Sequence, residues 1–303
     1  MNNKVVVIGC GNVGMAYIYA LLNQRTYVNR LVLVDVNRER IEGEVMDLNH
    51  CLSYAPSKIS INVGDYNDCH DAQLVVIAAG ANQKPGETRT DLINKNAGIF
   101  KDIVSKVMAS GFNGIFLVAT NPLDVMTYLT YKYSGLPANQ VIGSGTSLDT
   151  ARLQLMIGKK LCINPKNVQA YVIGEHGDSE FIPWSNANIS LQNIKEFFSK
   201  EEMDKIEYDV RNAAYEIINR KGATYYGIGM ALVRITNAIL GNENTIIAVS
   251  VFDEPNDVYI GMPAIINKNG AERRIPLTLT EEETIELQNS INIIKQNINS
   301  IVE

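Results

Sequence analysis

Val5-Val6-Val7-Ile8-Gly9-Cys10-Gly11-Asn12-Val13-Gly14 is the stretch that decides the fold. Its four apolar residues predict a buried strand, and the glycines form the pattern G-x-G-x-x-G at the start of a predicted helix. Gly9 permits a tight turn, Gly11 lets the backbone approach a pyrophosphate, and Gly14 lets the helix pack closely on the strand. Since the helix N-terminus favours an anion, the stretch predicts a dinucleotide site in a Rossmann-type domain.

An acidic residue stands where the second strand is expected to end. Asp35 lies 21 residues after Gly14, and a carboxylate there accepts hydrogen bonds from an adenosine ribose and repels a 2′-phosphate. The sequence therefore favours NAD over NADP, although Arg38 and Arg40 follow closely and can soften that preference. An ordinary glycine turn is the alternative, which motif, context and acidic residue together disfavour.

Short apolar runs alternate with helical patterns along the first half of the chain. Strands are expected over 5–8, 31–34, 59–63, 74–78 and 115–118, and helices over 13–24, 38–52 and about twenty residues after the loop at 80–90. Continuous β-branched runs between amphipathic helices indicate a parallel sheet covered on both faces. The fold class is therefore α/β, with an N-terminal doubly wound, Rossmann-type parallel sheet over 1–143.

The pattern changes after about residue 143, and an α+β catalytic domain is expected over 144–303. Helices are predicted over 147–161, 201–220 and 223–240, with a strand over 168–173. Antiparallel strands are predicted over 245–252, 258–267 and 273–279, with Asn269-Gly270 as the turn between the last two. A capping pattern at 280–283 begins a final helix, and we expect the two domains to pack as one rigid body.

Composition excludes several classes of function. The chain has 303 residues, of which 46% are hydrophobic and 20% charged, as in an ordinary globular protein. The net charge of −6 argues against nucleic acid, and no apolar run approaches the roughly 18 residues of a membrane span. The four cysteines show neither CxxC pairing nor zinc spacing, so we expect reduced thiols, no metal site and a cytoplasmic location.

The candidate chemistry centres on Gly174-Glu175-His176-Gly177-Asp178-Ser179-Glu180, which follows the expected strand 168–173. A crevice can open at such a strand end, and an imidazole there can transfer protons near neutral pH. Taken alone, a histidine at such a position is more often a surface or core residue whose ring is hydrogen-bonded within the protein. Proton transfer becomes the better interpretation if the chain also supplies a hydride carrier, an anion clamp and an orienting carboxylate.

Asp149 and Arg152 supply the last two groups. They lie three residues apart at the start of the predicted helix 147–161 and therefore share a face. A surface ion pair is the alternative. In the functional interpretation, Asp149 accepts the second imidazole N–H of His176, and Arg152 binds a carboxylate bidentately.

Two loops at the carboxyl end of the predicted sheet carry further polar groups. The loop 78–89 contains Gln83 and Arg89 among small residues that allow motion. The segment 119–124 contains Asn121, and Pro122 leaves the Asn121 side-chain amide free to point into the cleft. A solvated surface loop and a structural turn are the alternatives for these segments.

Taken together, the motifs resemble the lactate and malate dehydrogenase family. The segments that match, in order, are GxGxxG at 9–14, AGANQKPGETR at 79–89, NPLDV at 121–125, SLDTAR at 147–152, GEHGDSE at 174–180 and KGATYYGIG at 221–229. The resemblance covers essentially the whole chain and implies hydride transfer between NAD and a small 2-hydroxy acid. It implies that His176 is the proton donor and acceptor and Asp149 its orienting partner. Arg152 resembles the substrate carboxylate clamp, and Arg89 the loop arginine that closes and polarises the ketone.

The resemblance also implies sets of binding residues. The expected substrate-binding residues are Gln83, Arg89, Asn121, Asp124, Arg152 and Thr224. The expected cofactor-binding residues are Gly9, Gly11, Val13, Gly14, Asp35, Arg40, Tyr66, Gly80, Ala81, Ala119, Asn121, Ser144 and Ile228. Thr224 matches the position that lines the substrate methyl pocket, and Ile228 the one that packs on the nicotinamide ring.

Gln83 decides the expected substrate. In the malate dehydrogenases that the chain resembles, an arginine occupies this loop position and pairs with the second carboxylate of oxaloacetate. A neutral amide leaves that carboxylate buried without a cation, at a cost of several kcal/mol, so we expect pyruvate and L-lactate. A broader 2-hydroxy acid or malate dehydrogenase is the alternative enzyme. A non-catalytic nucleotide-sensing protein is the alternative of another class, and it has no need of the His176, Asp149 and Arg152 set.

Two departures from the family concern regulation and assembly. Bacterial members activated by fructose 1,6-bisphosphate share an arginine and a histidine at two positions. This chain, which resembles them, has Gln154 and Gln169 there. Neither amide pairs strongly with phosphate, so we expect weak or absent activation. The chain starts at the first strand, without the N-terminal arm of vertebrate tetramers, and its 184–205 segment looks shortened. We expect a homo-oligomer, and the choice between dimer and tetramer stays open.

Overall fold

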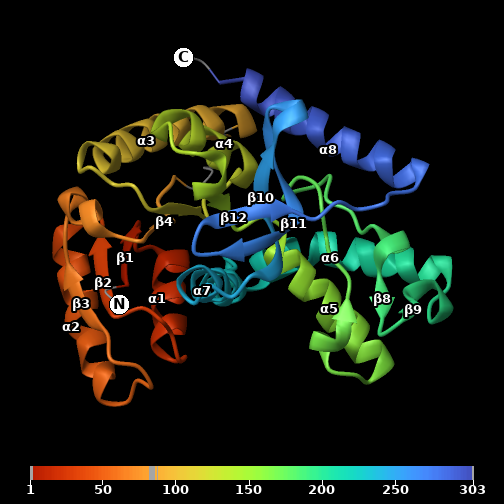
Figure 1. Cartoon of the computed structure of the whole chain (residues 1–303), viewed down its shortest axis with the longest axis horizontal. Coiled ribbons are helices and arrows are strands. Elements are labelled where there is room, and N and C mark those ends of the chain that lie inside the picture. Colours follow the sequence, from red (N-terminus) through yellow and green to blue (C-terminus); the bar gives the residue numbers. More distant parts are fainter. Residues whose placement is uncertain (1–2, 82–85, 87, 302–303) are drawn as a thin grey trace.

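The structure, a computed structural model, describes residues 3–81, 86 and 88–301, with only the backbone at Arg89. Within these ranges a nine-stranded sheet runs through the molecule and helices cover both of its faces (Figure 1). Six neighbouring strands are parallel, in the order β3-β2-β1-β4-β5-β6. They are β1 (Lys4–Ile8), β2 (Arg30–Val34), β3 (Ser60–Val63), β4 (Leu74–Ile77), β5 (Ile115–Val118) and β6 (Val141–Gly143). This is the doubly wound order, and the predicted fold class is confirmed.

Antiparallel strands from the second half of the chain extend the same sheet. β10 (Thr245–Asp253) pairs with β6 through Ser250 and Gly143, and β11 (Val258–Asn267) and β12 (Gly270–Arg274) follow. A second, three-stranded sheet consists of β7 (Val168–Gln169), β8 (Asn188–Ile189) and β9 (Gln192–Asn193). The large sheet therefore joins the two halves of the sequence.

The α-helices begin at side-chain caps in several places. Thr88, Ser199 and Thr280 each form a capping box with the acidic residue three positions later. The helices are α1 (Asn12–Leu22), α2 (Arg38–His50), α3 (Arg89–Ala109), α4 (Leu123–Ser134), α5 (Ser147–Leu161), α6 (Lys200–Lys221), α7 (Tyr226–Leu240) and α8 (Glu281–Asn299). Short 3₁₀ helices lie at Cys51–Ser53, Tyr66–Asp71, Ala138–Gln140, Pro165–Asn167, Trp184–Asn186, Ile194–Glu196 and Glu254–Asn256. In the described part of the chain, none of the helices combines the length and apolarity that crossing a bilayer requires.

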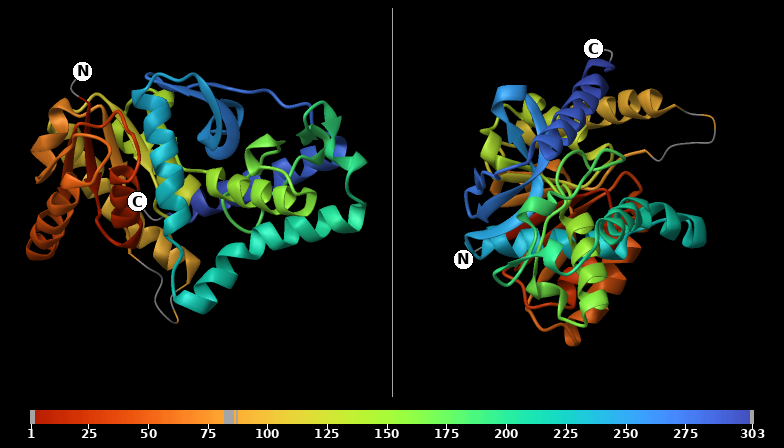
Figure 2. Two further views of the ribbon diagram at one scale, coloured as in Figure 1. Left: turned by 90° about the horizontal axis from the view of Figure 1, so that it is seen from below. Right: turned by 90° about the vertical axis from the view of Figure 1, so that its right-hand side faces the viewer.

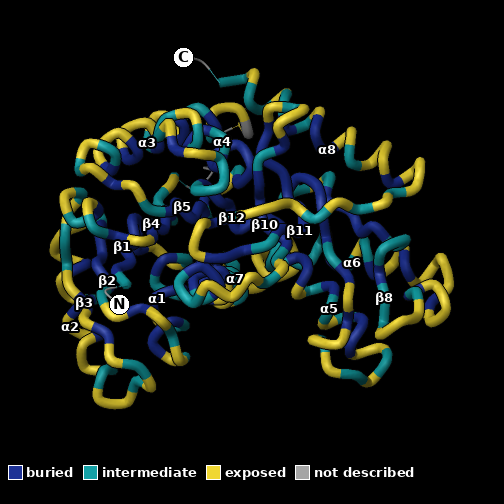
Figure 3. The backbone as a smooth tube through the Cα atoms, in the orientation of Figure 1, coloured by how far each residue is buried: buried dark blue, intermediate teal, exposed yellow. Residues whose placement is uncertain are grey.

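Alternation along the central strands divides the core between the two faces of the sheet. On β1, Val5 and Val7 pack with α1, α2 and α7, whereas Val6 and Ile8 pack with α3 and α4. Figure 3 shows the buried residues concentrated along the central strands. Figure 2 shows α7 crossing between α1 and α5, against both of which it packs. A third apolar cluster joins α5, α6 and the small sheet, so α5 rests on a rigid base.

The structure differs from the sequence-based expectation in a few segments. The predicted strand 273–279 is wrong in its bounds: β12 ends at Arg274, because Pro276 has no N–H to extend the ladder. Only the first two residues of the predicted strand 168–173 form a strand. Ala170, Val172 and Ile173 are buried, and the Val172 N–H donates to Thr150 Oγ1 at 3.0 Å instead of to a neighbouring strand. The sequence did not predict α4, β6, β8 or β9, which are short or follow a proline.

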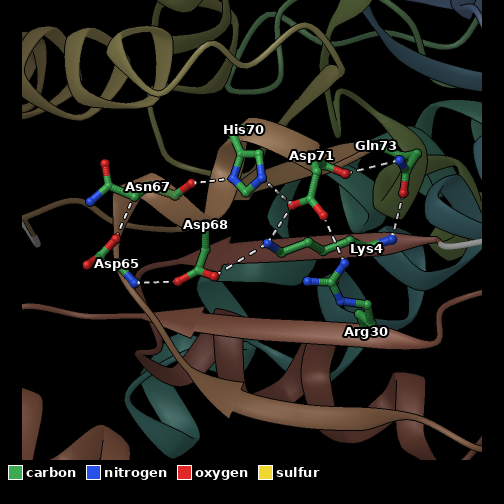
Figure 4. A network of polar contacts seen from close by, with 8 residues as sticks. All are labelled: Lys4, Arg30, Asp65, Asn67, Asp68, His70, Asp71 and Gln73. Carbon is green, nitrogen blue, oxygen red and sulfur yellow. Dashed lines mark hydrogen bonds and ion pairs between the residues drawn. The ribbon is translucent and has the colours of Figure 1, made fainter.

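A buried ammonium group fixes the first strand to the 3₁₀ helix at Tyr66–Asp71 (Figure 4). Lys4 is 0% exposed, and its Nζ donates to Asp71 Oδ1 at 2.7 Å and to Asp68 Oδ1 at 3.4 Å. Arg30 donates to the other Asp71 oxygen at 2.8 Å. The hydrogen bond from Lys4 is the main cause that lowers the pKa of Asp71 to about 2.

Asp71→Asn is expected to destabilise the protein by about 2 kcal/mol, because it leaves the buried Lys4 ammonium without its nearest counter-charge. Since the folded-state pKa is depressed, this stabilisation is present above about pH 4 and disappears as pH falls towards about 2. Urea unfolding of both proteins between pH 3 and 7 tests this. Lys4→Met, which removes the buried charge itself, should cost less than Asp71→Asn. Equal urea midpoints for wild type and Asp71→Asn at pH 7 would contradict the prediction.

Candidate active site

The stretch 174–180 is a closed loop held from several sides. Ile173 and Phe181 exchange backbone hydrogen bonds of 2.9 and 3.0 Å across its base. Gly174, with φ +98°, exchanges backbone hydrogen bonds with Gly261 of β11, and a Cβ on Gly174 would lie 2.6 Å from Ser290 Oγ of α8. A larger residue is therefore excluded at Gly174. The loop thus presents His176 from a rigid base formed by β11 and α8.

The three residues expected to carry the chemistry lie together. His176 Nδ1 is 2.8 Å from Asp149 Oδ2, and an Arg152 guanidinium nitrogen donates to Asp149 Oδ1 at 2.6 Å. Asp149 and Arg152 come from the first two turns of α5, on one face as their spacing predicts. The Asp149 side chain is 2% exposed, Arg152 12% and His176 26%, so the carboxylate lies behind the two cationic groups.

The charges of these groups stabilise one another. Burial disfavours the imidazolium, but the Asp149 carboxylate outweighs burial and raises the pKa of His176 to about 9. Burial alone would raise the pKa of Asp149, but His176 and Arg152 together hold that pKa below its usual value. At neutral pH the pair is therefore an imidazolium beside a carboxylate, which suits a group that donates a proton.

The resemblance placed Asp124 among the substrate-binding residues, and in the structure it contacts the backbone of His176. Asp124 on α4 is 2% exposed, and one of its oxygens accepts the His176 backbone N–H at 2.8 Å. Its other oxygen accepts the Ser250 hydroxyl from β10. Burial raises the pKa of Asp124 to about 6, although both donors favour its charged form. Asp124 lies behind the loop and holds the His176 backbone in place.

A cavity of about 850 Å³ lies at the carboxyl ends of β1, β2 and β4. Seven of the expected cofactor-binding residues line it: Gly9, Gly11, Asp35, Arg40, Tyr66, Gly80 and Ala81. The structure explains why these positions of the motif are glycine. Gly9 has φ +90°, a Cβ on Gly14 would lie 2.2 Å from the Gly9 carbonyl oxygen, and Gly11 faces open space. The N-terminus of α1 carries no side-chain cap, so its N–H groups are available to a pyrophosphate, and the residues present fit a dinucleotide.

Asp35 has a structural role that the sequence did not reveal. Its two oxygens accept the backbone N–H groups of Cys10 at 2.8 Å and of Asn37 at 2.9 Å. Arg40 donates to the Cys10 carbonyl oxygen at 2.9 Å and pairs with Glu44 at 3.2 Å. Asp35 and Arg40 therefore hold the glycine-rich turn in shape from both sides of Cys10.

Sequence reasoning missed Asn96, which connects the two loops of the site. Asn96 is fully buried in α3, accepts the Ala81 N–H at 2.8 Å and donates to the Asn121 carbonyl oxygen at 3.0 Å. Between Ile93 and Phe100 it is a polar residue on the buried face of an amphipathic helix, and that pattern was the available signal. The contact fixes the start of the 78–89 loop relative to the segment 119–124.

Comparisons with known proteins agree with this geometry. Residues 3–143 match the lactate/malate dehydrogenase NAD binding domain, and residues 146–303 match the lactate/malate dehydrogenase alpha/beta C-terminal domain. The chain belongs to the lactate/malate dehydrogenase family. An L-lactate dehydrogenase of Geobacillus sp. (strain WCH70) is 54% identical, with 97% of this chain and 95% of the relative covered. NAD as the cofactor and the predicted family are thereby confirmed.

Solved structures in the family have the same fold. A lactate dehydrogenase from a Medee basin deep-sea metagenome library is 54% identical, with a TM-score of 0.96 and 99% of this chain and 98% of that chain covered. The minor L-lactate dehydrogenase from Enterococcus mundtii, in a ligands-bound form, is 43% identical, with a TM-score of 0.97 and 99% of both chains covered.

The remaining expected site residues of this dehydrogenase fall into three groups. Gln83 lies outside the described residues, and Arg89 is the first residue of α3, with its side chain outside them. Ser144 is buried, whereas Asn121 is exposed at the surface of its segment. The residues Val13, Ala119, Thr224 and Ile228 are half-buried. Their contacts with cofactor and substrate stay predictions.

Proposed function

We propose that this dehydrogenase catalyses the reversible reduction of pyruvate to L-lactate with NADH. The observation that carries the proposal is the His176–Asp149–Arg152 arrangement, with hydrogen bonds of 2.8 and 2.6 Å, in a chain with L-lactate dehydrogenases among its relatives. Loss of NADH absorbance on addition of pyruvate tests it. Oxaloacetate and branched 2-ketoacids, assayed in parallel, distinguish the broader 2-hydroxy acid and malate alternatives. No NADH oxidation with any of these acids would favour a nucleotide-sensing protein.

Each residue of the arrangement has a task in the proposed reaction. Bound NADH supplies the hydride for the carbonyl carbon. Arg152 binds the substrate carboxylate through its planar fork, and this fixes the carbonyl group relative to His176. Protonated His176 donates a proton to the carbonyl oxygen from the ring nitrogen that does not face Asp149. Asp149 orients the ring and stabilises its charge, and Arg89 is proposed to polarise the carbonyl group.

Gln83→Arg is expected to raise the kcat/KM ratio of oxaloacetate to pyruvate by about 100-fold, because the new cation compensates a second buried carboxylate. Steady-state kinetics on both acids measure this ratio. Gln83→Leu, which changes the side chain without adding charge, is the control and should not favour oxaloacetate. A retained strict preference for pyruvate in Gln83→Arg would refute the charge argument.

Fructose 1,6-bisphosphate is expected to activate the enzyme by less than about tenfold at sub-millimolar concentration. Gln154 donates from Nε2 to the Val168 carbonyl oxygen at 3.2 Å, and its amide is therefore engaged by its own chain. Gln169 is exposed and uncharged. Pyruvate reduction at low substrate concentration, with and without the bisphosphate, measures the effect, and a larger response would contradict the prediction.

A homo-oligomer is part of the proposal. Two helices carry large apolar side chains that are exposed in the single chain, namely Tyr208, Tyr215, Ile217 and Ile218 on α6 and Tyr226 and Met230 on α7. Several large apolar side chains exposed on neighbouring helices favour contact with another protein surface, because contact removes them from water. Light scattering distinguishes a dimer from a tetramer, and a monomer would contradict the proposal.

The proposed location is the reducing cytoplasm. The four cysteines are free thiols, which suits that compartment.

A further inference from the structure

A third acidic side chain lies beside the His176–Asp149 pair. Glu180 ends the closed loop 174–180 and is 4% exposed. One Glu180 carboxyl oxygen, one Asp149 carboxylate oxygen and one ring nitrogen of His176 all lie within 4.8 Å of one another. The reaction proposed above assigns no task to Glu180, although a buried acid this close to a proton donor affects its charge balance.

The charged groups that face Glu180 come from three elements. Asp149 and Arg152 lie on α5, His176 on the same loop, and Arg211 on α6. Arg211 donates to the Glu180 backbone carbonyl oxygen at 2.7 Å and to Glu207 Oε1 at 3.0 Å, so its guanidinium is engaged beside the loop. Asp124 on α4 faces the backbone of His176.

The charges around Glu180 favour the protonated form of its carboxyl group. Glu207 compensates the charge of Arg211. Of the remaining groups, His176 and Arg152 supply two positive charges, and Asp149 and the carboxylate of a bound 2-keto acid supply two negative ones. An ionised Glu180 would add a third negative charge to a buried site, and a buried charge without a partner is unfavourable unless the group takes up a proton. Two carboxyl groups that share one buried site do not both ionise readily.

We propose that Glu180 is a positioning residue for the reaction proposed above: its carboxyl group keeps its proton beside the His176–Asp149 pair, so that the buried site accepts an anionic substrate. Burial, followed by the Asp149 charge, raises the pKa of Glu180 to about 9, which agrees with a neutral carboxyl group at physiological pH. Loss of that proton adds a charge that repels the substrate carboxylate. Alkaline pH then weakens the reaction through Glu180 as well as through His176.

Infrared spectroscopy tests the protonation state directly and needs no substrate. At about pH 7.5 the difference spectrum between wild type and Glu180→Gln should contain the C=O stretching band of a protonated carboxyl group. The band should vanish as wild type is titrated above about pH 9. Absence of the band at about pH 7.5 overturns the proposal, whatever acid the enzyme reduces, and wild type alone decides this if the variant does not fold.

Kinetics test the consequence for the substrate. Glu180→Gln, a neutral replacement of the same shape, should keep kcat/KM for pyruvate at pH 7 within about threefold of wild type. Above pH 9, kcat/KM of wild type should fall with the slope of two titrating groups, and that of Glu180→Gln with the slope of one. Glu216→Gln, at an exposed ion pair with Arg220 on the same helix α6, is the matched control and should keep the wild-type slope. The same slope in wild type and Glu180→Gln overturns the proposal.

Discussion

Replacing His176 by asparagine is expected to lower kcat/KM for pyruvate reduction by about 10³-fold, because the general acid of the reaction is lost. Asparagine keeps a polar side chain toward Asp149, so the loop held by Asp124 and Gly261 should stay in place. Steady-state NADH oxidation measures the loss. Binding of NADH, followed by fluorescence, should change little, because the cavity that Gly9 and Asp35 line is separate from the ring.

The raised pKa of His176 determines how kcat/KM should change with pH. The pKa of His176 is raised to about 9, so the ring is protonated and competent to donate below that value. Wild-type kcat/KM for pyruvate should therefore be level near neutral pH and fall as pH rises through about 9. The residual activity of His176→Asn should lack the titration of this group. His70→Asn, at an exposed histidine, is the control, and an unchanged profile in His176→Asn would remove His176 from the mechanism.

The sequence predicts those parts of the molecule whose cause is local. The glycine pattern 9–14 predicts a turn that the structure contains. Gly14 lies against Gly9 within one strand–helix unit, whereas the close neighbours of Gly9 are Ala78 and Ala79, which follow β4. The spacing of Asp149 and Arg152 predicts their common face, because helix geometry alone sets it. The doubly wound parallel sheet follows from alternating apolar runs and helices, since strand–helix–strand connections are right-handed.

Roles that depend on contacts between distant segments could not be predicted in the same way. Asp124 stands in a motif that suggests a ligand, yet Ser250, 126 positions further along, determines that it is buried. Asn96 resembles any polar helix residue until the fold brings Ala81 and Asn121 to it. Glu180 ends a recognised motif, but its distance from Asp149 depends on how the loop closes on β11.

Arg152→Lys is expected to raise the KM for pyruvate by about 100-fold with a smaller effect on kcat. Lysine keeps the charge but loses the planar fork, and a point charge cannot hold a carboxylate bidentately. A 100-fold change corresponds to about 2.7 kcal/mol, within the range for truncating a buried, hydrogen-bonded charge pair. The effect falls mainly on KM, because the clamp holds the substrate carboxylate both before and during the reaction.

A control separates this loss from a general effect of the substitution. Arg234 pairs with Glu243 at the surface, with side chains 48% and 30% exposed, so Arg234→Lys makes the same chemical change away from the site and should leave KM unchanged. Arg152 also donates to Asp149 at 2.6 Å, and its charge lowers the pKa of Asp149. Arg152→Lys should therefore raise the affinity of the His176–Asp149 pair for its proton only slightly, since a cation remains. An unaltered KM in Arg152→Lys would show that the substrate carboxylate binds elsewhere, and the assignment of His176 as the facing proton donor would then lose its geometric basis.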